Sequence, residues 1–450
     1  MNTERPLRVA IVGSGPAGFY AANALLTAEP AAEVDMLERL PTPWGLVRLG
    51  VAPDHPKLKE VSRAFERTAQ REGFRFFGNV ELGVDVTHDE LTELYDAVLY
   101  AVGAQTDRRL GIPGEDLPGS WAATQFVAWY NGHPDYQELE FDLSHERAVV
   151  IGNGNVALDV ARMLALNAEE LSPTDTTDAA IEAINGAGVK EIVVVGRRGP
   201  VQAAWTPVEV GELGDLAGAD ILIDPKELEL DEASAAELEA APGTVKRNVD
   251  HLRDYASREP QGKPRAIRLR FLRSPVAILG DDRVEGVELV RNELVEGRAV
   301  PTDDRETIEC GIVFRSVGYH GVALPGLPYD ERTGTIPNDA GRVEAGTYCA
   351  GWIKRGPTGI IGTNKKDANE TVALLLEDAA AGKLSHTDDR DLADVLVERG
   401  ASPVVYAGWE EIDRLEKEAG EPHGRPRIKL ATWDELLSAS AGVPRSRDAA

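Results

Sequence analysis

Residues 8–28 read RVAIVGSGPAGFYAANALLTA. An apolar run that ends at Val12 predicts a buried strand, and the turn GSGPAG (residues 13–18) separates it from a stretch with the apolar spacing of a helix. A second predicted strand ends at Glu38, twenty residues beyond Gly18. A strand, a GxGxxG turn, a helix and an acidic residue at this spacing together predict a Rossmann-type dinucleotide site.

The residues of this first motif indicate which nucleotide it takes. Gly13 permits the tight turn, Gly15 lets a pyrophosphate approach the backbone, and Gly18 lets the helix pack closely on the strand. Free N–H groups at the start of the helix hold the phosphates. The Glu38 carboxylate accepts hydrogen bonds from ribose hydroxyls and repels a 2′-phosphate. The first site therefore favours FAD or NAD over NADP.

The same order of elements begins again at residue 148. A predicted strand leads into a second glycine motif, Gly152, Gly154 and Ala157, in which alanine at the third position is a permitted variant. The next predicted strand ends at Arg197 and Arg198 in place of a carboxylate, and guanidinium groups bind phosphate through bidentate, charge-assisted bonds. The second site therefore favours NADP. The insert at 167–189 makes the spacing longer than the usual ~20 residues.

The repeated pattern predicts an α/β fold with two Rossmann-like dinucleotide-binding domains, one for FAD and one for NADP. A late apolar run, Gly346–Ala350, and the helix expected at Lys365–Leu376 are expected to rejoin the first domain, so that the second is inserted in it. The expected boundaries are 1–104 with 320–385 for the FAD domain and 105–319 for the NADP domain. Residues 386–450 form a C-terminal appendage packed on the FAD domain or trailing from it.

Composition narrows the functional classes. The chain has 450 residues, and 48 basic against 76 acidic side chains give a net charge of −28, which repels nucleic acid and anionic membranes. Only Cys310 and Cys349 are present, so we expect no disulfide framework, no CxxC chemistry and no metal site. No run approaches the roughly 18 apolar residues of a membrane span. We expect a cytoplasmic protein, monomeric, with neither nucleic acid nor membrane as a partner.

Longer motifs carry a family resemblance. They are GSGPAG (13–18), PTPWGLVRLGVAPDHP (41–56), GNGNVALDVAR (152–162), GRRGP (196–200) and GWIKRGPTGIIGTNKKDA (351–368). With these motifs the chain resembles the adrenodoxin reductase-like ferredoxin:NADP reductases, in particular the bacterial enzymes of actinobacterial type. The resemblance covers about residues 5 to 380, and EPHGRPRIKL (421–430) is similar to the family's C-terminal end.

The resemblance implies the site residues. Those expected to contact FAD, beyond Gly13 and Gly15, are Ala17, Gly18, Glu38, Leu46, Val80, Trp352, Gly359, Ile360 and Ile361. Those expected to contact NADP(H) are Arg108, Asn153, Gly154, Asn155, Val156, Arg197, Arg198, Glu209 and Gly359. His55 and Glu212 match a histidine and an acid proposed to assist catalysis.

The resemblance also implies the activity of a ferredoxin–NADP(+) reductase. Hydride passes from NADPH to FAD, and electrons then leave singly for a ferredoxin-type iron-sulfur protein. Alternatives remain: delivery to a small molecule or oxygen, a flavin subunit of a larger complex, or a nucleotide-sensing scaffold without catalysis. Because ferredoxins are usually acidic too, docking requires a local basic face. Its candidates are Lys246, Arg247, Arg265, Arg268, Arg270, Arg273, Lys354 and Arg355.

Overall fold

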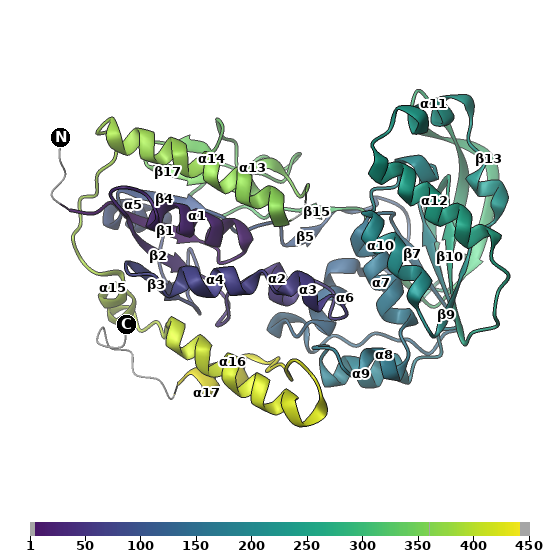
Figure 1. Cartoon of the computed structure of the whole chain (residues 1–450), viewed down its shortest axis with the longest axis horizontal. Helices are drawn as coiled ribbons and strands as arrows, with labels where there is room; N and C mark the ends of the chain where they lie inside the picture. The colour runs from purple at the N-terminus through teal and green to yellow at the C-terminus, as the bar shows by residue number, and fades with distance from the viewer. Residues whose placement is uncertain (1–4, 360, 442–450) are drawn as a thin grey trace. The chain divides into compact units, whose positions relative to one another are not determined.

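The structure is a computed structural model that describes residues 5–359 and 361–441 (Figure 1). Its contacts divide the chain into two compact units. Unit 1 comprises residues 1–106, 133–135 and 319–450, and unit 2 comprises 107–132 and 136–318. The chain passes from one unit to the other mainly at two places, β5 (Thr106–Asp107) and the start of β15 (Tyr319–His320). These two strands form a two-stranded sheet.

A six-stranded sheet forms the centre of unit 1. Its order is β16 (Arg342–Glu344), β17 (Thr347–Cys349), β4 (Ala97–Tyr100), β1 (Arg8–Val12), β2 (Glu33–Leu37) and β3 (Phe74–Phe77). All neighbours are parallel except β16 and β17. The late strand β17 therefore completes a sheet that the first hundred residues begin, and the carboxyl ends of the parallel strands share one edge.

Helices cover both faces of this sheet. They are α1 (Pro16–Leu26), α2 (Leu46–Leu49), α3 (Pro56–Lys59), α4 (Ser62–Ala69), α5 (His88–Leu94), α13 (Trp352–Arg355), α14 (Ile361–Ala380), α15 (Leu392–Glu398), α16 (Tyr406–Gly420) and α17 (Trp433–Ser440). The late helix α14 packs on α1, again joining the two ends of the chain. From the C-terminal helices, Trp409, Ile412 and Leu436 enter the same hydrophobic core, so these helices are an integral part of unit 1.

Unit 2 contains a second, fully parallel six-stranded sheet. Its order is β6 (Ser120–Ala122), β14 (Ile312–Arg315), β7 (Arg147–Ile151), β8 (Glu191–Val195), β10 (Arg265–Arg270) and β9 (Ala219–Leu222). The helices of this unit are α6 (Ala123–Tyr130), α7 (Asn155–Ala165), α8 (Ala168–Leu171), α9 (Asp178–Asn185), α10 (Pro207–Glu212), α11 (Glu232–Ala240) and α12 (Gly243–Ser257). Two Rossmann-like sheets, the second inserted between parts of the first, confirm the predicted fold class.

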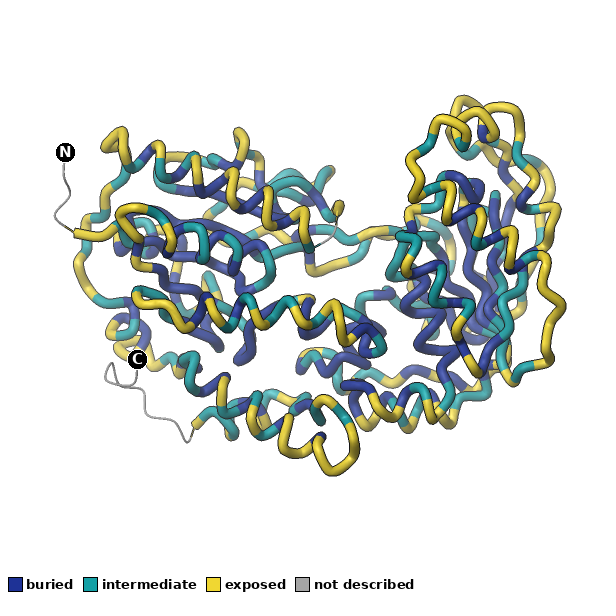
Figure 2. Tube along the Cα trace, in the orientation of Figure 1, coloured by how far each residue is buried: buried dark blue, intermediate teal, exposed yellow. Residues whose placement is uncertain are grey.

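The second sheet is buried on both faces. Ala148 and Val150 of β7 point into a core with the helices, whereas Val149 and Ile151 point into a separate core on the other face. That other face is covered by an antiparallel sheet, β11 (Arg273–Leu279), β12 (Gly286–Val295) and β13 (Arg298–Glu309). Burial on both faces explains why β7 and β8 are continuous apolar runs. Figure 2 shows buried residues concentrated on the central strands of each unit.

Among the described residues, none of the helices combines the length and the apolar character that crossing a membrane requires.

Candidate functional site

The first glycine turn has a different requirement at each glycine. Gly13 has φ +104°, and a Cβ there would lie 2.6 Å from the Ala101 carbonyl oxygen. A Cβ at Gly18 would lie 2.1 Å from the Gly13 carbonyl oxygen. At Gly15 an added Cβ would meet nothing within 4 Å. Gly13 and Gly18 are thus required by packing, whereas the space above Gly15, at the start of α1, is open to a phosphate.

Glu38 lies beside this turn. It follows β2, whose Leu37 pairs with Val12 at the end of β1. Its carboxylate accepts hydrogen bonds from the Ser14 amide at 3.1 Å and from the Ser14 hydroxyl at 2.7 Å. Val80 donates its backbone N–H to the Glu38 carbonyl oxygen at 3.0 Å. The structure therefore places the acid and Val80 at the carboxyl edge of the first sheet, next to the glycine turn.

Two other predicted flavin segments meet the same turn. Gly45, which precedes Leu46 of α2, would place a Cβ 3.0 Å from the Gly15 Cα atom, and Leu46 itself is 37% exposed. A Cβ at Gly351, before Trp352 of α13, would lie 2.7 Å from the Ala17 Cβ atom. Gly45 and Gly351, far apart in the sequence, thus both lie against the start of α1.

The remaining predicted flavin positions lie near the start of α14. Gly359 has φ +82°, and Ile361 begins the helix. Ile360, also predicted as a flavin contact, lies outside the described residues.

The second glycine turn repeats this geometry in unit 2. A Cβ at Gly152 would lie 2.0 Å from the Ser316 carbonyl oxygen, while one at Gly154 would meet nothing within 4 Å. Ala157, at the third position, is fully buried. Asn153 accepts the backbone N–H of Ala204 at 3.0 Å, and Asn155 accepts that of Thr206 at 2.9 Å. The turn, which also includes Val156, is therefore fixed to the segment that leads into α10.

Arg197 and Arg198 lie next to this second turn. Val195 pairs with Ile151, and a Cβ at Gly196 would lie 3.1 Å from the Asn153 Cβ atom. The long insert forms α8 and α9 and leaves this strand pairing intact. Within the described parts of the chain, neither guanidinium has an ion-pair or hydrogen-bond partner. Two unpaired cations beside a glycine turn suit a phosphate.

Arg108 lies on the side of unit 2 where β14 ends. Its side chain is exposed, and its backbone N–H donates to the Gly318 carbonyl oxygen at 2.9 Å.

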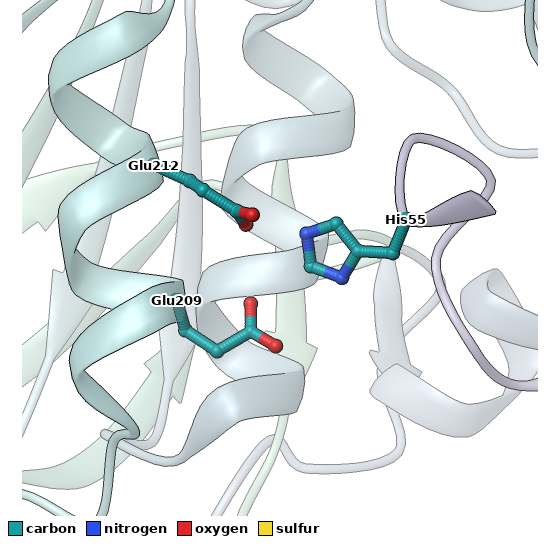
Figure 3. Close-up of side chains that lie close together, drawn as sticks. All are labelled: His55, Glu209 and Glu212. Atoms are coloured by element: carbon teal, nitrogen blue, oxygen red, sulfur yellow. The ribbon is translucent and has the colours of Figure 1, made fainter. Parts of the chain in front are cut away.

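Helix α10 carries Glu209 and Glu212 one turn apart, and Figure 3 shows both carboxylates on the same side of the helix. The Arg162 guanidinium lies 3.2 Å from the Glu209 carboxylate and 2.7 Å from that of Asp159. Burial raises the pKa of Glu209, and the charges of Asp159 and Glu212 raise it further, while Arg162 opposes them. Glu209 is therefore a carboxyl group that binds a proton more readily than an ordinary glutamate.

His55 belongs to unit 1 and caps the start of α3. Its backbone N–H donates to the Ala52 carbonyl oxygen at 3.0 Å, and its carbonyl oxygen accepts from Leu58 at 3.1 Å. Its ring is drawn in Figure 3. The turn fixes the backbone from which the ring extends.

Most of the cations proposed for a basic docking face make contacts within the fold. Arg265 donates to the carbonyl oxygens of Leu164, Leu166 and Ile184. Ion pairs join Arg268 to Glu191, Arg270 and Arg273 to Glu227 and Glu306, and Lys354 and Arg355 to Asp367. Backbone carbonyls therefore hold Arg265, and acids within the fold pair with the other five cations. The sequence could not show this, because the acidic partners lie on other strands and helices.

Three further residues organise these sites and were not predicted from the sequence. Ser14 donates to Glu38, Arg162 orients Glu209, and Asp367 accepts the Gly351 N–H at 2.5 Å. Each lies within a quoted motif, so the motif gave a signal, but only the tertiary contacts identify the role.

Comparisons with known proteins agree with this arrangement. The family model described as pyridine nucleotide-disulphide oxidoreductase matches residues 7–185. The NADPH-ferredoxin reductase FprA of Mycobacterium tuberculosis is 53% identical, over 97% of this chain and 100% of that protein. The mitochondrial NADPH:adrenodoxin oxidoreductase of Arabidopsis thaliana is 42% identical, over 98% of this chain and 96% of that protein.

A solved structure gives the same result in three dimensions. That of Mycobacterium tuberculosis FprA in complex with NADPH has a TM-score of 0.93 and 52% identity, over 97% of this chain and 100% of that chain. Similarity of this extent includes both glycine motifs and the segments that surround them. The chain belongs to the adrenodoxin reductase-like ferredoxin:NADP reductases, as its motifs predicted, and it is an oxidoreductase.

Proposed function

We propose that this protein is an FAD-containing ferredoxin–NADP(+) reductase that takes hydride from NADPH and passes electrons singly to a ferredoxin-type iron-sulfur protein. One observation carries the proposal: two similar glycine turns end in opposite charges. Glu38 stands beside the first turn, and Arg197 and Arg198 stand beside the second. A carboxylate selects free ribose hydroxyls and an arginine pair selects a 2′-phosphate. One unit therefore suits FAD and the other suits NADP(H).

The residues of unit 1 fit FAD. The open space above Gly15 admits a pyrophosphate, and the Glu38 carboxylate lies beside it for the adenosine ribose. Leu46, Val80, Trp352, Gly359 and Ile361 are proposed to line the rest of the flavin site, with Ile360 carried forward from the sequence. On this basis residues 1–104 with 320–385 form the FAD domain and 386–450 extend it.

The residues of unit 2 fit NADP(H). Asn153, Gly154, Asn155 and Val156 surround the open space at the start of α7, where N–H groups are available to phosphate oxygens. Arg197 and Arg198 are proposed to bind the 2′-phosphate, and Glu209 and Arg108 to contribute further contacts, with Gly359 of unit 1 carried forward from the sequence. Residues 105–319 are then the NADP domain. A protonated Glu209 can donate a hydrogen bond to a carbonyl, which an ionised carboxylate cannot do.

Bound flavin supplies the redox chemistry, because it accepts hydride in one step and releases electrons one at a time. The protein's residues bind, orient and hold protons. His55 and Glu212 are proposed as the catalytic residues on the family resemblance.

The cysteines support a one-electron acceptor. Cys310 and Cys349 are buried free thiols, and burial raises the pKa of each to about 12. A protonated, buried thiol is a poor nucleophile, so neither is suited to the disulfide chemistry that the family model's description mentions.

We extend the proposal to the compartment and the oligomeric state. Two inert free thiols suit a reducing compartment, and we propose the cytoplasm. We also propose a monomer. Sedimentation velocity of the holoenzyme is expected to give one species near the chain mass of 48.5 kDa, and a species of twice that mass would contradict it.

The function is tested by steady-state turnover with NADPH and cytochrome c, with and without a ferredoxin. Cytochrome reduction is expected to depend on added ferredoxin, and oxygen consumption without ferredoxin is expected to stay slow. Oxygen consumption as fast as the ferredoxin-coupled rate would replace the proposal with an oxygen-reducing flavoprotein.

A further inference from the structure

The loop at 41–51 lies between the first glycine turn and the C-terminal helices. On one side, the Trp44 backbone N–H donates to the Ser14 carbonyl oxygen at 3.0 Å, and Gly45 lies against Gly15. Trp44 has φ +83°, a left-handed conformation that is unfavourable for a bulky residue. Such a conformation persists only where the surrounding structure holds it. The loop therefore needs support from outside itself.

Helix α16 supplies part of that support through tryptophan. The Trp44 and Trp409 rings are 4.8 Å apart at 77°, an edge-to-face contact, and the Arg48 guanidinium lies 5.1 Å above the Trp409 ring. Trp409 is 1% exposed. Aromatic pairs and cation–π contacts in such buried positions are favourable beyond the area they bury.

A buried carboxylate supplies the rest. Glu416 of α16 is fully buried and accepts two hydrogen bonds from Arg48, at 2.8 and 2.5 Å. It also accepts from Arg427 at 2.8 Å and from the Leu430 amide at 2.9 Å. The Lys429 ammonium donates to the Arg48 carbonyl oxygen at 3.3 Å. The arginines keep the pKa of Glu416 below its usual range despite burial, so the cluster stays charged and directional.

The position of Arg48 connects this cluster to the cofactor side. Arg48 and Leu46 are two residues apart in the single turn of α2, so their side chains leave on nearly opposite sides. Arg48 is 4% exposed and points to Glu416, whereas Leu46 is 37% exposed. The side of the turn that carries Arg48 is thus held by Glu416, and the side that carries Leu46 is left exposed.

We propose that Glu416 and Trp409 are positioning residues for FAD, which hold the loop at 41–51 against the glycine turn from the C-terminal helices. Helix α16 then acts on the flavin site through this loop. The inference rests on the proposed binding of FAD by unit 1. It predicts that loosening the cluster speeds the release of FAD from the folded enzyme.

The test measures FAD release from the holoenzyme after dilution, by the rise of flavin fluorescence, together with the melting temperature with and without excess FAD. Glu416→Gln and Trp409→Leu are expected to release FAD at least about tenfold faster, and the same excess of FAD is expected to raise their melting temperature by no more than it raises the parent's, because weaker binding stabilises less. Glu418→Gln is the matched control, because Glu418 is on the same helix, 59% exposed, and pairs only with Arg414 in the described chain. Its release rate is expected to equal the parent's.

A role confined to stability predicts a different result. If the variants melt earlier but release FAD within twofold of the parent rate, the inference is wrong. Should Glu416→Gln yield no folded holoenzyme, Trp409→Phe and Trp409→Leu decide: the ring-retaining variant is expected to release FAD near the parent rate and the leucine variant faster, and equal rates in both overturn the inference. The KM for NADPH at saturating FAD is expected to be unchanged.

These readouts separate the inference from the proposed function. A parent protein that purifies without flavin would defeat the proposed function itself. Normal flavin retention with unchanged release in every variant would defeat only the positioning role.

Discussion

Single residues are proposed to distinguish the two nucleotide sites. The sequence predicts ribose recognition by Glu38 and phosphate recognition by Arg197 and Arg198 from residue type and position after a strand, and the structure places each beside its glycine turn. The roles of Ser14, Arg162 and Asp367 were not predicted, because each depends on a partner that only the folded chain brings near. Local chemistry was therefore predictable at this scale, and its orientation by neighbouring side chains was not.

The arginine pair at 197 and 198 is expected to determine the preference for NADPH over NADH. Arg197→Ala with Arg198→Ala is expected to raise the KM for NADPH by about 100-fold or more, since each lost bond to a charged group costs about 1.5–3 kcal/mol. The KM for NADH is expected to change less than threefold, because NADH lacks the phosphate. Arg298→Ala, an exposed arginine in the β12–β13 turn region, is the control. Equal losses with NADPH and NADH would contradict phosphate recognition by this pair.

Asp107 gives a pH-dependent prediction. Burial raises its pKa from 3.8 to about 6, although a hydrogen bond from Thr124 opposes the shift. The folded state therefore favours the protonated form, so the stability from this group is present below pH 4 and is lost as the pH rises through about 6. Asp107→Asn is expected to stabilise the protein by about 1–3 kcal/mol at pH 8, and by much less at pH 4.

Thermal unfolding at both pH values measures this effect, with the exposed Asp303→Asn as control. An Asp107→Asn variant that is no more stable than the parent at pH 8 would show that burial of the charged Asp107 carboxylate does not destabilise the folded protein.

Secondary-structure elements were predictable where the pattern was local. The strands and helices of both glycine motifs match β1, α1, β7 and α7 closely, because period and breakers define them. The antiparallel sheet of β11 to β13 was not anticipated, and neither was the charge pairing across it. Both depend on which segments meet in three dimensions. A long insert looked like a departure from the motif in sequence, but strand pairing shows that it is only a longer connection.

Substitutions at two glycines of the turn before α1 are expected to affect different properties, stability at Gly13 and FAD binding at Gly15. Gly13→Ala is expected to lower the melting temperature of the protein by several degrees, because the Cβ would lie 2.6 Å from a carbonyl oxygen and φ is positive. Gly15→Ala is expected to leave the apoprotein's melting temperature nearly unchanged and to weaken FAD binding, because the added methyl group occupies only open space. If Gly15→Ala bound FAD as tightly as the parent, the pyrophosphate would have to lie elsewhere.

The arginines of β10 and β11 are expected to stabilise unit 2 and not to bind ferredoxin. Because Arg270 lies between Glu227 and Glu306, Arg270→Glu is expected to destabilise unit 2 by about 1–3 kcal/mol, after allowance for its partial exposure. The KM for ferredoxin is expected to change less than threefold in enzyme that remains folded. A large rise in that KM without loss of thermal stability would restore Arg270 to the docking face.

For the whole molecule, the sequence predicted the class of fold, the insertion of one sheet within the chain of the other, and the family. It did not predict that the C-terminal helices enter the core of unit 1. The burial of Trp409, Ile412 and Leu436 depends on residues far away in the sequence, which only the folded chain brings into contact with them. The net charge of −28 does not describe any one face of the protein, since several arginines proposed to bind a partner are paired with acids inside the fold. Overall charge therefore says little about the docking face.

We propose that unit 1 binds FAD, that unit 2 selects NADPH, and that electrons leave the flavin one at a time. Anaerobic stopped-flow mixing of the oxidised holoenzyme with NADPH or NADH, followed by flavin absorbance, and then by addition of oxidised ferredoxin, tests it most directly. NADPH is expected to bleach the flavin rapidly, NADH to do so at least about 100-fold less efficiently, and each NADPH consumed to reduce two ferredoxins. Equal bleaching by NADH, or reduced flavin that ferredoxin cannot reoxidise, would contradict it.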